Sequence, residues 1–147
     1  MRFRLSPRAF ACCVGMLWLG QAGLAAAQVV LIVHPDSPLR AVSAKEASDL
    51  YLGRLRSLGV LENPRILEHP TDSALRERFF RGLNGMTIRQ LNAYWARLRF
   101  SGEVLPPESL PDSRAVLGRV RRDRNAIGYV DQAVLDGTVR VVLVVKE

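Results

Sequence analysis

An unbroken apolar run, Val29–Val33, restricts the fold of this chain more than any other segment. Its residues are mostly β-branched and none is polar, a pattern typical of a strand buried on both faces of a sheet. Residues 138–145 form a second, mostly apolar run near the C-terminus. We therefore expect both runs to be central strands that are flanked by helices.

The first 27 residues have the pattern of a secretory signal peptide. Three arginines accompany an apolar stretch at residues 9–19, and Ala25 and Ala27 supply the small residues that signal peptidase recognises. A stretch of about eleven apolar residues is too short to span a bilayer comfortably. We therefore predict cleavage after Ala27 and export to the periplasm.

Removal of residues 1–27 leaves residues 28–147 as one small domain, large enough for a single hydrophobic core. Cys12 and Cys13 leave with the signal, so no disulfide is expected, which fits a bacterial periplasmic protein better than a small disulfide-bonded module. Three of the 21 basic residues and none of the 14 acidic ones are lost, so the net charge falls from +7 to +4. This moderate charge favours acidic partners only weakly.

Helix and strand signals alternate along the rest of the chain. Short strands are expected at residues 65–69 and 127–130. Four helix starts are expected, of which the first and third are capping boxes: Ser43, Ser73, Thr87 and Ser113. This alternation predicts an α/β domain with a mostly parallel sheet, in which ligands bind beyond the carboxyl ends of the strands.

The turn after the strand at residues 65–69 is the candidate binding site. It leads directly into a helix, whose first turn offers unpaired backbone N–H groups and the positive end of the helix dipole. An oxyanion can bind there, held further by a hydroxyl and a guanidinium. A simpler alternative is that Asp72 or Ser73 only caps the helix. The candidate ligand contacts are His69, Thr71, Ser73, Ala74, Leu75 and Arg76.

Four segments resemble the periplasmic phosphate-binding proteins of ABC transporters. In chain order they are Val-Val-Leu-Ile-Val-His-Pro at residues 29–35, Leu-Tyr-Leu-Gly-Arg at 50–54, residues 71–80, and Asn-Ala-Ile-Gly-Tyr-Val at 125–130. The similarity is closest to short, single-domain relatives described as phosphate-transporter substrate-binding-like proteins. The resemblance implies a single periplasmic-binding-protein-like lobe that holds inorganic phosphate or a similar oxyanion with helix N-termini. It also implies an ABC permease or a membrane sensor protein as a partner.

The candidate turn departs from the pattern of these proteins. Their turn reads Arg-Ser-Asp-Gly-Ser-Gly-Thr, and residues 69–75 of this chain take its place. Ser73 keeps a polar contact, but a histidine replaces the arginine and Leu75 replaces the threonine. Arg76 can restore the positive charge. Two functions therefore remain open: oxyanion binding for transport or sensing, and a protein-interaction or sensor input module of the same fold that has lost its ligand.

Other chemistries are less well supported by the sequence. No GxSxG motif surrounds Ser73, and the only two histidines, His34 and His69, lack the spacing of a zinc site. The basic run at residues 119–124 is interpreted as solvated charge at a helix end rather than a nucleic-acid site. The sequence thus predicts a protein that is not an enzyme, with no cofactor, no metal site and no nucleic-acid partner.

Overall fold

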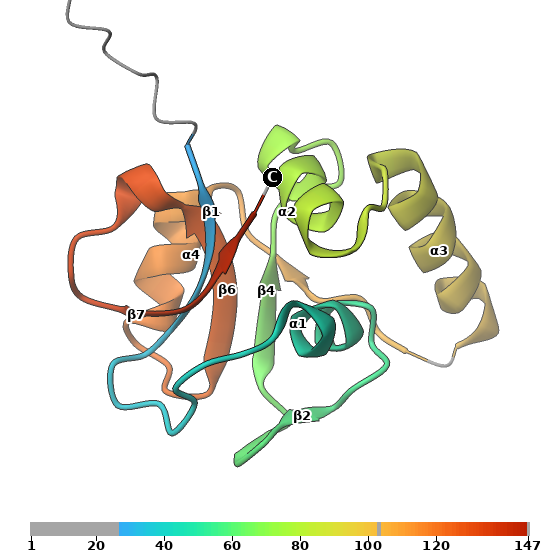
Figure 1. Cartoon of the computed structure of the whole chain (residues 1–147). Coiled ribbons are helices and arrows are strands. Elements are labelled where there is room, and N and C mark those ends of the chain that lie inside the picture. The colour runs from blue at the N-terminus through green and yellow to red at the C-terminus, as the bar shows by residue number, and fades with distance from the viewer. Residues whose placement is uncertain (1–26, 103, 147) are drawn as a thin grey trace, which may run out of the picture.

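A five-stranded sheet forms the middle of the computed structural model, which describes residues 27–102 and 104–146 (Figure 1). The strand order is β5-β4-β6-β1-β7, with the strands β1 (Val29–Val33), β4 (Arg65–Glu68), β5 (Glu108–Ser109), β6 (Ala126–Asp131) and β7 (Arg140–Val145). β4 pairs in parallel with β5 and β6, whereas β1 pairs antiparallel with β6 and β7. Four strands therefore run in one direction and β1 runs against them, so the predicted mostly parallel sheet is confirmed.

The β1 strand has the central position that its composition predicts. All five of its residues are buried. Val29 and Leu31 pack into the core on one face of the sheet, and Val30 and Ile32 pack into the core on the other. The alternation follows from the pleat, which turns successive side chains to opposite faces. A strand that is covered on both faces needs apolar residues at every position, as this run has.

The prediction that residues 138–145 form a central strand is wrong, because β7 lies at the edge of the sheet. Val141 is 37% exposed and Val144 is 44% exposed. The pairing of β1 with β7 also shifts register between Leu31 and Ile32, which breaks the regular alternation of buried and exposed positions along β7. Apolar composition alone does not distinguish an irregular edge strand from a central one.

Helices cover both faces of the sheet. One face carries α1 (Ala44–Tyr51), α2 (Ala74–Asn84) and, further out, α3 (Ile88–Ser101), and the other carries α4 (Ser113–Val120) (Figure 1). α4 approaches β6 closely, since a Cβ atom at Gly128 would collide with Val116. A short hairpin, β2 (Ser57–Leu58) and β3 (Leu61–Glu62), follows α1, and a 3-10 helix, η1 (Gln132–Val134), follows β6. The three-layer α/β arrangement is the predicted fold class.

The helix starts agree with the local sequence signals. Ser43 and Thr87 are the N-caps of α1 and α3, and each forms a complete capping box with the residue three positions later. Ser73 is the N-cap of α2, and Gly85 ends that helix in the left-handed conformation with φ of 74°. The predicted signal peptide, residues 1–27, lies outside the described residues apart from Ala27. Within the described residues, no helix has the length and apolar character needed to cross a membrane.

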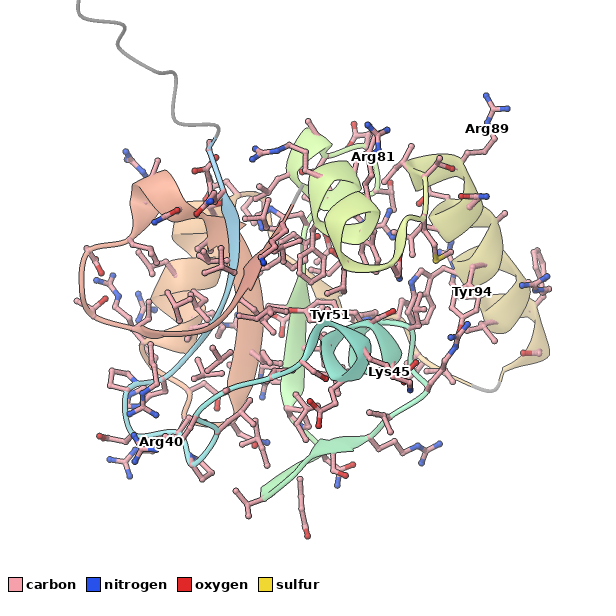
Figure 2. All side chains as sticks on the ribbon, in the orientation of Figure 1. Arg40, Lys45, Tyr51, Arg81, Arg89 and Tyr94 are labelled. Carbon is pink, nitrogen blue, oxygen red and sulfur yellow. The ribbon has the colours of Figure 1, made fainter. Side chains whose placement is uncertain are left out.

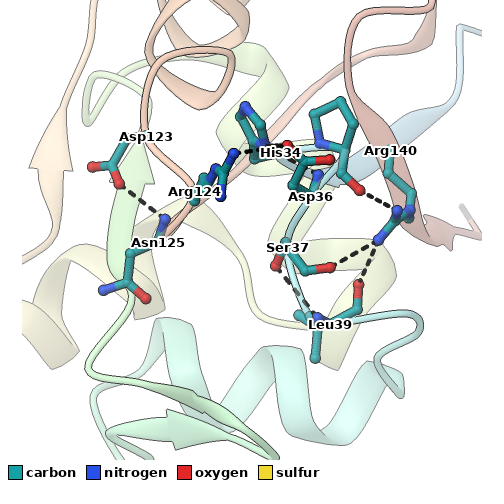
Figure 3. Close-up of polar contacts among 9 residues, drawn as sticks. His34, Asp36, Ser37, Leu39, Asp123, Arg124, Asn125 and Arg140 are labelled. Carbon is teal, nitrogen blue, oxygen red and sulfur yellow. Dashed lines mark hydrogen bonds and ion pairs between the residues drawn. The ribbon is translucent and has the colours of Figure 1, made fainter.

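Arg140 fixes the loop that follows β1. Its Nη1 donates hydrogen bonds to the carbonyl oxygens of Ser37 (2.9 Å) and Leu39 (3.4 Å), and its Nη2 donates to that of Pro35 (Figure 3). Arg124 donates to Asp36 in the same loop at 3.1 Å. Because β1 runs against β4 and β6, this loop lies at the amino ends of those strands. It is therefore at the opposite ends of these strands from the candidate site.

Candidate functional site

A cavity of about 410 Å³ lies at the carboxyl ends of β4 and β5. This position agrees with the rule that open α/β sheets bind ligands beyond the carboxyl ends of their parallel strands. We call it the polar cavity; it is lined by Glu68, His69, Thr71, Arg76, Asn92, Trp95, Arg99, Pro106, Pro107 and Ser109. Three elements supply most of its polar side chains: the end of β4 with its turn, the first turn of α2, and the inner side of α3.

Glu68, the last residue of β4, is buried beside the cavity with only 5% of its surface exposed. Its Oε1 accepts hydrogen bonds from the Tyr129 hydroxyl and from the His69 backbone N–H, the latter at 3.0 Å. Its Oε2 lies 3.3 Å from Nε of Arg76. The carboxylate therefore connects β4 to β6 and to the first turn of α2.

Arg76 is buried as deeply as Glu68, with 3% of its surface exposed. Its Nη1 donates to Oδ1 of Asn92 at 2.7 Å and to the Thr71 carbonyl oxygen at 3.4 Å. Its guanidinium lies 5.7 Å from the centre of the Phe80 ring. Arg76 was predicted to supply positive charge at the helix start. It is instead buried, and its charge is neutralised by the ion pair with Glu68.

The protonation of this cluster follows from burial. Burial raises the pKa of the Glu68 carboxyl, and the nearby Arg76 acts in the opposite direction. Burial also lowers the pKa of His69, so its ring is neutral at pH 7. His69 Nε2 lies 2.9 Å from the Tyr129 carbonyl oxygen, which can only accept, so this nitrogen carries the proton. Burial and the Glu68 charge raise the pKa of Tyr129, whose hydroxyl stays protonated and donates to Glu68.

Three buried polar atoms in the walls of the cavity have no hydrogen-bond partner among the described residues. They are Oε2 of Glu68, Nε of Arg76 and Nε1 of Trp95. Glu68 and Arg76 are close enough for an ion pair, but the angle between them does not meet hydrogen-bond geometry. Buried polar atoms normally find a partner, and each unpaired one is costly. Two N–H donors and one carboxylate oxygen of residues that line the cavity are thus buried without a hydrogen bond among the described residues.

The structure divides the predicted contact residues into two groups. His69, Thr71 and Arg76 line the polar cavity, whereas Ser73, Ala74 and Leu75 do not. Ser73 caps α2, and its Oγ accepts from the backbone N–H of Arg76 at 3.4 Å. This is the capping role that the sequence left open for Asp72 or Ser73.

Several cavity residues were not among the sequence candidates. Asn92, Trp95 and Arg99 come from α3. Glu68 is the second-last residue of the strand predicted at residues 65–69. A carboxylate near the end of a buried strand is the one sequence signal that would have identified it as a cavity residue. The α3 residues carry no such local signal, because their place in the cavity depends on how α3 packs against the sheet.

Other charged groups have structural partners. Arg119 and Arg121 of the basic run pair with Glu108 (2.9 Å) and Asp136 (3.3 Å). In the described part of the chain, no three His, Cys, Asp or Glu side chains lie close enough to hold a metal ion. Figure 2 shows Arg81 and Arg89 pointing away from the core, with Tyr51 between α1 and the sheet. Tyr51 donates from its hydroxyl to the Leu67 carbonyl oxygen at 3.2 Å.

No protein-family model and no curated protein matches the chain. Solved structures do match its fold. A Clostridium perfringens protein, assigned as a phosphate ABC transporter substrate-binding protein and solved with bound phosphate, has a TM-score of 0.62 at 18% identity. The match covers 78% of this chain and 44% of that protein.

Two further structures give similar values. An ABC-type phosphate transport receptor from Vibrio cholerae has a TM-score of 0.60 at 11% identity, covering 78% of this chain and 45% of the receptor. A possible phosphate-binding protein from Planctomyces limnophilus has a TM-score of 0.59 at 12% identity, covering 78% of this chain and 40% of that protein. This chain therefore spans less than half of each protein. It has the fold of the corresponding part of these phosphate-transport binding proteins.

Proposed function

We propose that this chain is a periplasmic domain that binds phosphate or a related oxyanion, for transport or sensing together with an ABC permease or a membrane sensor. The observation that carries the proposal is the polar cavity at the carboxyl ends of β4 and β5, where Arg76, Arg99, Asn92, His69 and Thr71 supply polar side chains to the lining. The binding proteins with a similar fold support the same class of ligand. Binding, rather than catalysis, is the proposed activity.

The charges of the cavity suit a weakly held anion. Glu68 offsets Arg76, and His69 is neutral, so Arg99 at the cavity wall supplies the remaining positive charge. Oε2 of Glu68 lies 3.3 Å from Nε of Arg76, so the carboxylate is held in this ion pair and its charge is offset there.

The first turn of α2 provides a second group of donors next to the cavity. The first intrahelical hydrogen bond runs from the Glu77 N–H to the Ser73 carbonyl oxygen at 3.1 Å. The amides of Ala74 and Leu75 precede it and lack an intrahelical acceptor. A charge-assisted hydrogen bond contributes roughly 1.5–3 kcal/mol. With about three such contacts and the cost of immobilising the ion, we expect binding of about −4 to −8 kcal/mol, which is millimolar to micromolar.

Calorimetric titration of the purified protein with phosphate tests the proposal. Arg99→Gln should weaken binding by roughly three- to ten-fold and flatten its salt dependence, because it removes the unpaired cation of the cavity. Arg89→Gln is the matched control, since it removes an exposed arginine of the same helix that does not line the cavity. Ser73→Ala should weaken binding several-fold, with the N-cap variant Ser43→Ala as its control.

Two results would contradict the proposal. If phosphate and sulfate at tens of millimolar give no more thermal protection than a chloride solution of equal ionic strength, the oxyanion function is wrong. Equal losses of affinity for Arg99→Gln and Arg89→Gln would instead show that binding does not occur in the polar cavity.

An interaction module is the second candidate, and the surface of α3 favours it. Phe100 is 93% exposed near the end of this helix, which carries three arginines and no acidic residue. An exposed aromatic side chain among arginines is typical of a binding surface for an acidic partner protein. Photo-crosslinking from position 100 in intact cells tests this role, with the exposed Val60 as the control position. A discrete adduct from position 100 alone supports the interaction module.

A further inference from the structure

A second cavity, of about 330 Å³, lies next to the polar cavity. Most of its wall is hydrophobic, and we call it the apolar cavity. Its main apolar residues are Leu50, Leu55, Ile66, Val104 and Leu105. Trp95, Pro106 and Pro107 line both cavities, so the two share a wall.

The two cavities follow one another along β4. Ile66 lines the apolar cavity and Glu68 lines the polar one. These residues are two positions apart on one strand, so their side chains lie on the same face of the sheet, about 7 Å apart along the strand. Both cavities lie on this face, and each is lined by Trp95 of α3 and by Pro106 and Pro107. The two cavities are therefore neighbours along β4, and we call them together the groove.

Trp95 stands at the junction of the two ends. Only 4% of its surface is exposed, and its Nε1–H has no acceptor among the described residues. An indole supplies a large apolar surface and one hydrogen-bond donor. The residue lines both cavities, so its ring can contact a ligand group in either one.

We propose that the groove binds an organic oxyanion, namely a phosphomonoester with a small apolar group, in preference to inorganic phosphate. The anion occupies the polar cavity and the apolar group occupies the apolar cavity, with the Trp95 ring between them. This inference rests on the proposed function and specifies its ligand. Inorganic phosphate fills only the polar end and leaves the hydrophobic end to water.

The mouth of the apolar cavity supports this occupant. Leu55 is 37% exposed and Leu105 is 89% exposed there, so both present hydrophobic surface that a ligand would cover. Arg65 and Glu108, which also line this cavity, form an ion pair at 3.4 Å. Each charge of this pair offsets the other, and Arg56 is the remaining charged residue of the lining.

Parallel calorimetric titrations with phenyl phosphate and with inorganic phosphate test the inference. Phenyl phosphate should bind about ten-fold more tightly or better, because its ring removes apolar surface from water. The fluorescence of Trp95 should change with phenyl phosphate, since the ring would lie against the indole. Leu55→Ser and Leu105→Ser, tested singly, should reduce the preference for phenyl phosphate and leave the affinity for inorganic phosphate unchanged.

Val60→Ser is the matched control, because it removes an exposed apolar side chain of the β2–β3 hairpin that lines neither cavity. If inorganic phosphate binds and phenyl phosphate binds no more tightly, this inference fails and the proposed function stands. If neither probe binds, both fail. A preference that Leu55→Ser, Leu105→Ser and Val60→Ser all leave intact would exclude the apolar cavity as its cause.

Discussion

The ion pair of Glu68 and Arg76 sets the electrostatics of the polar cavity. Both side chains are almost fully buried, and their charged groups are 3.3 Å apart. Removing two charges from water is costly, and their mutual attraction offsets that cost only in part. The pair therefore adds little attraction for an anion, although Nε of Arg76 makes no hydrogen bond within the described residues.

Glu68→Leu should destabilise the protein by roughly 3–5 kcal/mol, because it leaves the Arg76 guanidinium buried and unpaired. The double variant Glu68→Leu with Arg76→Met should recover most of that loss, since it removes both charges from the interior. The Tyr129 hydroxyl loses its acceptor in both variants. The difference between their free energies of unfolding therefore measures the cost of the buried, unpaired guanidinium. Denaturant unfolding measures the free energies. Equal stability of the single and double variants would contradict this account.

For single residues, the sequence predicts interactions within one helical turn well and interactions between separate elements poorly. The capping of α2 by Ser73 depends on residues within one turn, and the sequence offered it as one of two roles. The inward position of Arg76 depends on Glu68, Asn92 and Tyr129, which lie on β4, α3 and β6. No local sequence pattern brings those residues together. The sequence therefore could not show that the charge of Arg76 is buried and neutralised rather than presented at the helix start.

At the scale of elements, α2 and α3 differ in how firmly they are packed. Four of the eleven residues of α2 are buried, including Phe79 and Phe80. Only two of the fourteen residues of α3 are buried, Leu91 and Trp95. Tyr94 adds one anchor by donating from its hydroxyl to the Leu52 carbonyl oxygen at 2.7 Å. α3 thus forms a wall of the groove and packs against the rest of the domain through few buried side chains.

Hydrogen exchange followed by mass spectrometry should show faster exchange in α3 than in α2, because few buried contacts oppose the local opening of α3. Saturating phosphate should slow exchange in α3, since Asn92, Trp95 and Arg99 line the polar cavity. It should leave exchange in α4, on the other face of the sheet, unchanged. Equal protection of α3 and α2 from exchange in the absence of ligand would contradict this account, because it would show that few buried contacts do not make α3 open more readily.

The strands show where an apolar pattern predicts position and where it does not. β1 and β7 are both rich in valine, but β1 is central and β7 is at an edge. β1 has a neighbour on each side and helices on both faces, so all of its residues are buried. β7 has only β1 beside it in the sheet, and its irregular register exposes Val141 and Val144. Neighbours in a sheet are set by topology, which composition does not encode.

At the scale of the whole molecule, β1 is paired into the sheet from its first residue. Val29 is fully buried and pairs with Asp131 of β6 and Val145 of β7. The carbonyl oxygen of Gln28 accepts a hydrogen bond from the Gln132 N–H at 2.8 Å. A cut after Gln28 would therefore remove a hydrogen-bond acceptor of the sheet, and a cut after Val29 would remove part of β1.

We predict that the protein recovered from the periplasm begins at Gln28, because cleavage after Ala27 leaves β1 intact and satisfies the small-residue rule of signal peptidase. N-terminal sequencing or intact mass spectrometry of the periplasmic fraction measures this directly. Ala27→Lys should block processing, since it places a large charged residue at the cleavage position. Ala26→Lys is the matched control, because the position between the two small residues is not recognised and processing should continue. Periplasmic protein that begins at Met1, or at Val30 or later, would show that the signal peptide or its boundary is wrong.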